Sequence, residues 1–379
     1  EGDNNTAIGN NSLRYNTTAN NNTAVGKSAL SANTTGTGNT ALGYATIMSS
    51  VDGDYNTAVG FGAFSSSGND GDYNTAVGWY ALGSSDVSGH NNVAIGRQPA
   101  YSITSGSSNI CIGYQAGGTI TTGDSNTCIG QATLAATTTV SGLVAVGSGA
   151  LTSNTSGYHN TAIGTNALDA CTEGFNNTAL GYDALTAETT GDKNTAVGNI
   201  ALTSSVGGIG NTAVGHRALT LLTDGTYNTC IGEAAGATLT SALGNTALGY
   251  NAMGRADVTG SSNTAVGREA GNDVTSGHYN VFVGAYTGDD LTTGYNNTLL
   301  GKYAGNSGTP GGAVTDGANG IFLGNENVTE ANIQVDWTIA SDKRDKTDVS
   351  PMDLGLEFIN QLEPVTYRWD KRSKYSDDQ

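Results

Sequence analysis

A five-residue pattern of polar, small and aliphatic positions recurs along most of the chain. It reads Asn, a β-branched residue, a small residue, an aliphatic residue and Gly, as in Asn22-Thr23-Ala24-Val25-Gly26 and Asn194-Thr195-Ala196-Val197-Gly198. The closing glycine occurs at positions 9, 26, 43, 60, 78, 96, 113, 130, 147, 164, 181, 198, 215, 232, 249, 267, 284, 301 and 324. These 19 copies are 17 residues apart in fourteen intervals, 18 apart in three and 23 apart in the last. A fixed period of this kind indicates a repeat architecture.

Each column of the repeat predicts a place in the structure. The residue before the glycine is Val, Ile or Leu in all 19 copies, and the residue two earlier is Thr, Val or Ile in all 19. Side chains alternate along a strand, so these two columns share one side of it. We expect this side, including its Thr column, to point inward.

The column between them is Ala or Cys in 16 copies, which predicts close packing at this position. We interpret this small-residue face as the one that allows close approach of chains around an axis. It becomes Phe282, Leu299 and Phe322 in the last three copies, which we expect to mark a widening or cap.

A second apolar pair follows the glycine by three or four residues, as in Ala29-Leu30 and Ala167-Leu168, and predicts a second short strand. A second glycine lies seven residues before the first in 16 copies. A 17-residue unit is too short for a two-helix repeat and lacks helical periodicity. The sequence therefore predicts an all-β solenoid or β-roll of about 19 coils, stacked at about 4.8 Å to a length of roughly 85 Å. Stacked Asn side chains would form a hydrogen-bonded ladder, and a homotrimer would help to bury the thin core.

Composition and charge exclude several classes of protein. Glycine accounts for 56 of 379 residues, without the every-third-residue spacing of collagen, and proline for only 4. The net charge of −18 disfavours nucleic acid and anionic membrane surfaces as partners. No apolar run approaches the 18 residues that membrane insertion requires. The chain begins within the pattern and without Met, so we expect it to be a piece of a longer protein.

The repeats offer little that predicts catalysis, a cofactor or a metal site. Cys111, Cys128 and Cys230 occupy the small-residue column, where buried thiols are expected, and Cys171 lies in a loop. The histidines fall in separate coils and no Cys or His spacing is typical of zinc. Gly26-Lys27-Ser28 resembles the end of a phosphate loop but lacks the glycine five residues earlier. We therefore predict no cofactor and no metal.

Two groups of turn residues leave alternatives open. Asp52-Gly53-Asp54 and Asp70-Gly71-Asp72 could bind Ca²⁺ weakly, although turn chemistry explains them as well. Tyrosines gather just before the strand pattern, where a sugar-stacking role and a packing role are both open. They are Tyr55, Tyr73, Tyr158, Tyr227, Tyr279 and Tyr295.

The sequence changes character after Gly324. Trp337-Thr338-Ile339-Ala340 predicts a strand, and a dense run of charged residues follows. Ser350 is a suitable N-cap and Pro351 suits the first turn of a helix over 351–362. Alternating residues at 365, 367 and 369 predict a further strand.

This C-terminal segment resembles a known family. The motif Ser341-Asp-Lys-Arg-Asp-Lys346 and the stretch Leu356-Glu-Phe-Ile-Asn-Gln-Leu-Glu-Pro-Val-Thr-Tyr-Arg-Trp369 are similar to the start of the intramolecular chaperone domain of phage tail spikes and fibres, the peptidase S74 family. The resemblance implies a domain that trimerises, guides folding of the preceding stalk and releases itself by a single-turnover cleavage. It also implies Ser341 as nucleophile and Lys346 as general base, with the cut bond next to Ser341. No metabolic activity is expected.

These observations predict three regions: a β-solenoid shaft over 1–328, a connecting strand over 329–340 and the N-terminal part of a small α+β chaperone domain over 341–379. The repeats also resemble, more loosely, the heads of trimeric bacterial adhesins. We therefore expect an extracellular homotrimeric tail-fibre shaft on a virion. A host cell-surface glycan or protein is a second partner that the sequence leaves open. The alternative is a bacterial surface adhesin or filament. A polysaccharide-degrading enzyme lacks a catalytic pair, and an ice-binding solenoid is disfavoured by the expectation that Thr points inward.

Overall fold

The repeats fold into one coil each, and each coil contributes one strand to a single sheet. The computed structural model describes residues 2–66, 68–83, 86–137, 139–309 and 312–332. The chain divides into two compact units, residues 1–329 and 330–379. The strands are β1 (Thr6–Ile8), β2 (Thr23–Val25), β3 (Thr40–Leu42), β4 (Thr57–Val59), β5 (Thr75–Val77), β6 (Val93–Ile95), β7 (Ile110–Ile112), β8 (Thr127–Ile129), β9 (Val144–Val146), β10 (Thr161–Ile163), β11 (Thr178–Leu180), β12 (Thr195–Val197), β13 (Thr212–Val214), β14 (Thr229–Ile231), β15 (Thr246–Leu248), β16 (Thr264–Val266), β17 (Val281–Val283), β18 (Thr298–Leu300) and β19 (Ile321–Leu323).

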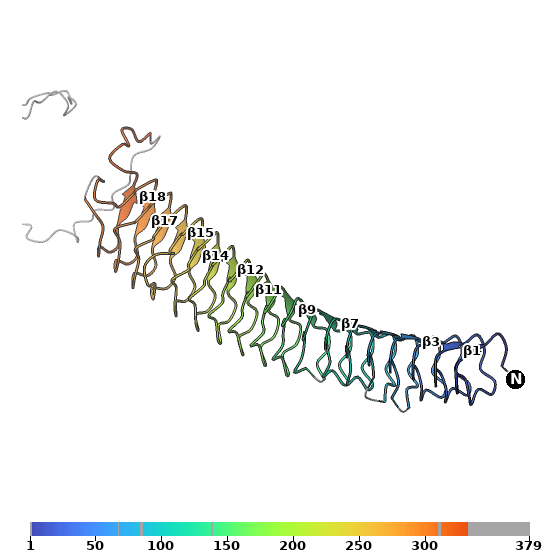
Figure 1. Cartoon of the computed structure of the whole chain (residues 1–379). Helices are drawn as coiled ribbons and strands as arrows, with labels where there is room; N and C mark the ends of the chain where they lie inside the picture. The colour runs from blue at the N-terminus through green and yellow to red at the C-terminus, as the bar shows by residue number, and fades with distance from the viewer. Residues whose placement is uncertain (1, 67, 84–85, 138, 310–311, 333–379) are drawn as a thin grey trace, which may run out of the picture. The chain divides into compact units, whose positions relative to one another are not determined.

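Successive strands pair in parallel along the whole sheet, so the coils lie one behind another (Figure 1). The register joins equivalent residues, as in Thr161 with Thr178. The register also holds across an 18-residue coil, where Thr57 pairs with Thr75, because the extra residue lies outside the strands. The predicted all-β solenoid with a 17-residue period is therefore confirmed, and no helix occurs among the residues that the structure describes.

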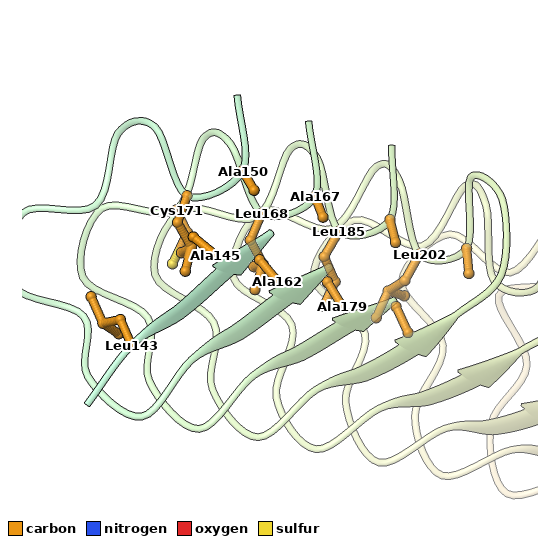
Figure 2. Packing of buried hydrophobic residues seen from close by; sticks show 14 of the residues in the cluster. Leu143, Ala145, Ala150, Ala162, Ala167, Leu168, Cys171, Ala179, Leu185 and Leu202 are labelled. Carbon is orange, nitrogen blue, oxygen red and sulfur yellow. The ribbon is translucent and has the colours of Figure 1, made fainter. Parts of the chain in front are cut away.

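The interior of each coil is filled by two facing columns. From β2 to β18 the middle residue of the strand is buried, and it is usually Ala. A leucine four residues after the glycine comes from the turn across the coil, and Leu168 and Leu185 are fully buried. Figure 2 shows these leucines in the same cluster as Ala162 and Ala179. The core of a coil therefore consists of one side chain from the strand and one from the facing turn.

The expected orientation of the strand was wrong. The first and third residues of β2–β18 are exposed or half-buried, whereas the Ala column is fully buried within its own coil. The coil is too narrow for two facing columns of branched side chains, so Ala on the strand leaves room for Leu on the opposite turn. Ala179, for example, does not face another chain, and Thr178 points outward.

The predicted second strand was also wrong. Ala29-Leu30 and Ala167-Leu168 lie in turns, with Leu30 at φ 49° and Leu168 at φ 52°. A left-handed residue breaks the extended backbone that a strand needs. These leucines still fill the core, but they do so from a turn.

The glycine that ends each strand turns the chain where coils approach most closely. Gly181 has a φ of 145°, and a Cβ at this position would collide with the carbonyl oxygen of Gly198 in the next coil. Both the backbone conformation and the close approach therefore exclude other residues.

The predicted asparagine ladder is present inside the coils. The Asn211 backbone N–H donates to Oδ1 of Asn194 at 2.9 Å, and the Asn228 N–H donates to Oδ1 of Asn211 at 3.0 Å. The Asn211 side-chain amide donates to the carbonyl of Gly225 at 2.7 Å. Each asparagine thus joins two coils through buried groups, which are costly to leave unpaired. Leu143 interrupts the ladder, although its own N–H still donates to Asn126.

Bulky interior residues at the C-terminal end lie next to glycines of the turn. Phe282 and Leu299 replace Ala in the strand column and are fully buried. Glycine replaces the turn leucine next to both, at 288 and 305. The strand predicted at 337–340 and the helix predicted at 351–362 lie outside the described residues.

Candidate functional site

The outward side of the sheet forms a continuous surface, which we call the strand face and define as the first and third residues of β1–β19. The first residue is Thr in 14 strands and Val or Ile in the others, and the third is always Val, Ile or Leu. The larger side chains are well exposed, with Leu180 at 44% and Leu300 at 49%. The face is therefore an apolar stripe beside a hydroxyl stripe.

The strand face carries no charge, although the protein is strongly acidic. None of its 38 positions is Asp, Glu, Lys or Arg, whereas the chain holds 33 acidic and 15 basic residues. Nineteen rows at about 4.8 Å, each about 10 Å wide, give a face of roughly 900 Å². The apolar stripe is about half of this area, and a standard interface takes about 800 Å² from each partner. The strand face thus has the size and chemistry of an interface.

Sequence reasoning missed this surface because branched apolar residues usually mark a core. The small residue between the two columns in 16 of the 19 copies was the available indication, since a narrow interior demands Ala in coil after coil. The outward Thr column also removes the reason given for disfavouring an ice-binding surface, because that reason required Thr to point inward.

Four of the six tyrosines of the turn before the strand stack on rings of neighbouring coils. Tyr55 and Tyr73 are stacked with centroids 5.3 Å apart, and Tyr158 stacks on Phe175 at 4.8 Å. Tyr295 stacks on His278 at 5.3 Å. These contacts give the four rings a packing role between coils, while Tyr227 and Tyr279 remain 66% and 62% exposed.

The aspartates of the same turn are used by the backbone. Asp54 Oδ1 accepts the N–H of Thr37 at 2.6 Å, and Asp72 Oδ1 accepts the N–H of Asp54 at 2.8 Å. A hydrogen bond with Asp70, together with partial burial, raises the pKa of Asp52. Turn chemistry therefore accounts for these residues. Within the described ranges, no group of three or more His, Cys, Asp or Glu side chains is placed to hold a metal ion.

The cysteines are buried thiols, as expected. All four are free, and Cys111 and Cys128 are register partners in adjacent strands. Burial raises the pKa of Cys230 to about 12, and burial with the nearby Glu188 carboxylate raises that of Cys171 to about 12. Thiols of this kind are poor nucleophiles at neutral pH. Among the described residues no helix has the length and apolar character needed to span a membrane.

The predicted catalytic pair, Ser341 and Lys346, lies outside the described residues. Its geometry is therefore not part of the structure, and its role stays a prediction.

Comparison with protein families gives one match, which covers this segment. Residues 341–379 match the Peptidase_S74 family, described as the chaperone of endosialidase. Comparisons with curated proteins and with solved structures gave no significant match. A β-solenoid followed by a segment of this family fits a tail fibre or tail spike with a C-terminal chaperone.

Proposed function

We propose that the chain is the shaft of an extracellular phage tail fibre, which assembles as a homotrimer and takes part in host attachment. Its C-terminal segment acts as the chaperone that matures it. The observation that carries this proposal is the uncharged, exposed strand face running through all 19 coils of a chain that ends in a chaperone-family segment.

A second copy of the same chain is the partner that suits the strand face best. Every coil presents the same residue types at the same spacing, so a copy placed in register meets an apolar row at each coil. The absence of charge removes electrostatic repulsion between acidic chains at this surface. An assembly of three chains is supported by the trimerisation that the chaperone resemblance implies.

The assembly is tested by charges placed on two adjacent rows. Ile163→Lys with Leu180→Lys should convert a species of three times 38.3 kDa into a folded monomer in sedimentation equilibrium. The matched control, Val206→Lys with Leu221→Lys, changes two equally exposed aliphatic residues outside the strand face and should leave the trimer intact. A wild-type chain that is a stable monomer would contradict assembly, and ice shaping by that monomer would favour the Thr column as an ice-binding surface.

The maturation is tested separately on the full-length protein. In the proposed reaction the Ser341 hydroxyl attacks an adjoining peptide carbonyl while the neutral amine of Lys346 accepts its proton. The peptide C–N bond then breaks, Lys346 returns the proton to the leaving amine, and water hydrolyses the ester formed on Ser341. Ser341→Ala and Lys346→Ala should each abolish cleavage in an intact-mass measurement, whereas Ser350→Ala should not. Equal processing of all three variants would rule out the dyad.

A bacterial surface adhesin or extracellular filament is the alternative. The same strand face and the loose resemblance to adhesin heads support it. The genomic neighbourhood separates the two, since virion structural genes favour the fibre and a secretion or anchor domain favours the adhesin.

A further inference from the structure

The residue after each strand glycine forms a column that varies between coils. It is Ser148, Thr165, Asn199 or Glu233 in several coils, so the fold does not require a ring there. In six consecutive coils, however, this column holds only aromatic or basic side chains. We call them the ridge: Lys27, Tyr44, Phe61, Trp79, Arg97 and Tyr114.

The ridge is held in place by its own contacts and stays accessible. Tyr44 and Phe61 are stacked with centroids 4.9 Å apart. Arg97 lies over the rings of both Trp79 and Tyr114, 5.2 Å from each centroid. Trp79 remains 42% exposed and Tyr114 39% exposed. An aromatic surface fixed in this way loses little side-chain entropy when a ligand binds.

A hollow lies beside the end of the ridge. It has a volume of about 150 Å³ and is lined by Gln98, Tyr101, Gln115, Gly118, Thr119 and Ala135. Gln98 and Gln115 directly follow Arg97 and Tyr114 in the chain. Neither glutamine amide makes a side-chain hydrogen bond within the described part of the chain, so both keep their donors and acceptors for a ligand.

These groups suit a neutral sugar. A sugar ring offers C–H groups, which pack on aromatic rings, and a rim of hydroxyls, which pair with amides and hydroxyls. No charged side chain lines the hollow, and the two cations of the ridge, Lys27 and Arg97, lie over rings of the ridge itself. The net charge of −18 repels acidic polysaccharides at long range. The ridge extends over six coils, so several sugar units of one chain could lie along it.

We propose that the ridge and the hollow form a binding site for a neutral glycan of the host surface. This inference rests on the proposed function in host attachment and assigns that attachment to coils two to seven.

The test begins with the whole chain on an array of neutral and acidic bacterial surface polysaccharides. A neutral glycan should bind, and an oligosaccharide cut from it should then be titrated by calorimetry and by tryptophan fluorescence, with Trp79→Ala separating the signal of Trp79 from that of Trp337 and Trp369. Gln115→Ala and Trp79→Ala should each weaken its affinity by tenfold or more. Tyr182→Ala is the matched control, because Tyr182 occupies the same column, is 51% exposed and lies between Thr165 and Asn199. It should leave the affinity unchanged.

Sedimentation of the same variants separates this site from the assembly. Variants that remain trimeric and lose glycan binding support the site. A trimeric wild-type chain that binds no neutral glycan, or one whose binding falls equally in Tyr182→Ala, overturns the inference and leaves the fibre assembly standing. A monomeric wild-type chain contradicts the assembly whatever it binds.

Discussion

Phe282 and Gly288 share one space inside a coil. Phe282 stands where most strands have Ala, and Gly288 stands where nine of the 19 turns have Leu. A Cβ on Gly288 would collide with the Phe282 ring, and a Cβ on Gly271 of the preceding coil would come within 2.8 Å of it. A large residue on the strand is thus matched by a missing side chain on the turn.

This exchange of volume predicts strong coupling between the two positions. Gly288→Leu alone should destabilise the coil by about 1–3 kcal/mol through overpacking. Phe282→Ala alone should cost about 3–5 kcal/mol through a cavity. The double variant restores the Ala and Leu pair of other coils, such as Ala179 with Leu185, and should cost clearly less than the sum. Because stability in a solenoid is local, the measurement is hydrogen exchange at amides of the coils around β17.

The outcome that contradicts this prediction is simple additivity. Effects that sum to within about 0.5 kcal/mol would show that the two residues do not compete for space.

The asparagine ladder predicts a large cost for one small truncation. Asn211→Ala would leave the N–H of Asn228 and the carbonyl of Gly225 buried without their partners. Each orphaned group costs about 1–3 kcal/mol, so a loss of about 2–6 kcal/mol is expected in local hydrogen exchange. Asn199→Ala changes an exposed asparagine of a neighbouring coil and should cost under about 0.5 kcal/mol. Equal effects of the two substitutions would mean that the ladder adds nothing to stability.

The buried carboxyl of Glu188 predicts a pH dependence of stability. Oε2 accepts from the Ser205 hydroxyl at 2.6 Å and Oε1 from the Gly191 N–H at 2.6 Å, but burial raises the pKa above its ordinary value of 4.5. The folded state therefore holds this proton more tightly than the unfolded state. Its contribution is fully present below pH 4.5 and is lost as the pH rises through the raised value.

Glu188→Gln removes this titration while keeping an acceptor for Gly191. Between pH 4 and pH 7, hydrogen exchange at amides around residue 188 should become slower in this variant relative to the wild type, because only the wild type loses the contribution of the proton. Glu173→Gln, at an exposed position in the preceding coil, should follow the wild type at every pH. A constant offset between Glu188→Gln and the wild type would contradict the prediction.

Much of the fold followed from spacing alone. A 17-residue period with one glycine per strand specifies parallel strands in register, as Thr161 and Thr178 illustrate. Which side of the strand faces inward did not follow, because Thr and Val beside Ala look like a core when the width of the coil is unknown. The turn at Leu30 was missed because leucine gives no indication of a positive φ.

The compensation between strand and turn was visible in the sequence and was missed. Glycine replaces the turn leucine at 117, 236, 288 and 305, in coils where Cys or a larger residue replaces Ala at 111, 230, 282 and 299. The match has two exceptions, because the Cys128 coil keeps Leu134 and Gly271 lies in the coil of Ala265, next to the Phe282 ring. Residues Ser341 and Lys346 came from resemblance alone, and spacing within the repeats gave no information about them.

The register across the 18-residue coils has an evolutionary consequence. Because an added residue is absorbed outside the strands, the sheet, the ladder and the core depend only on the strand pattern itself. Duplication of a gene segment that encodes 17 residues therefore inserts a complete coil, whose strand and asparagine pair with the coil on each side. The length of the shaft therefore changes in steps of one strand spacing and is set by the number of repeats that the gene encodes.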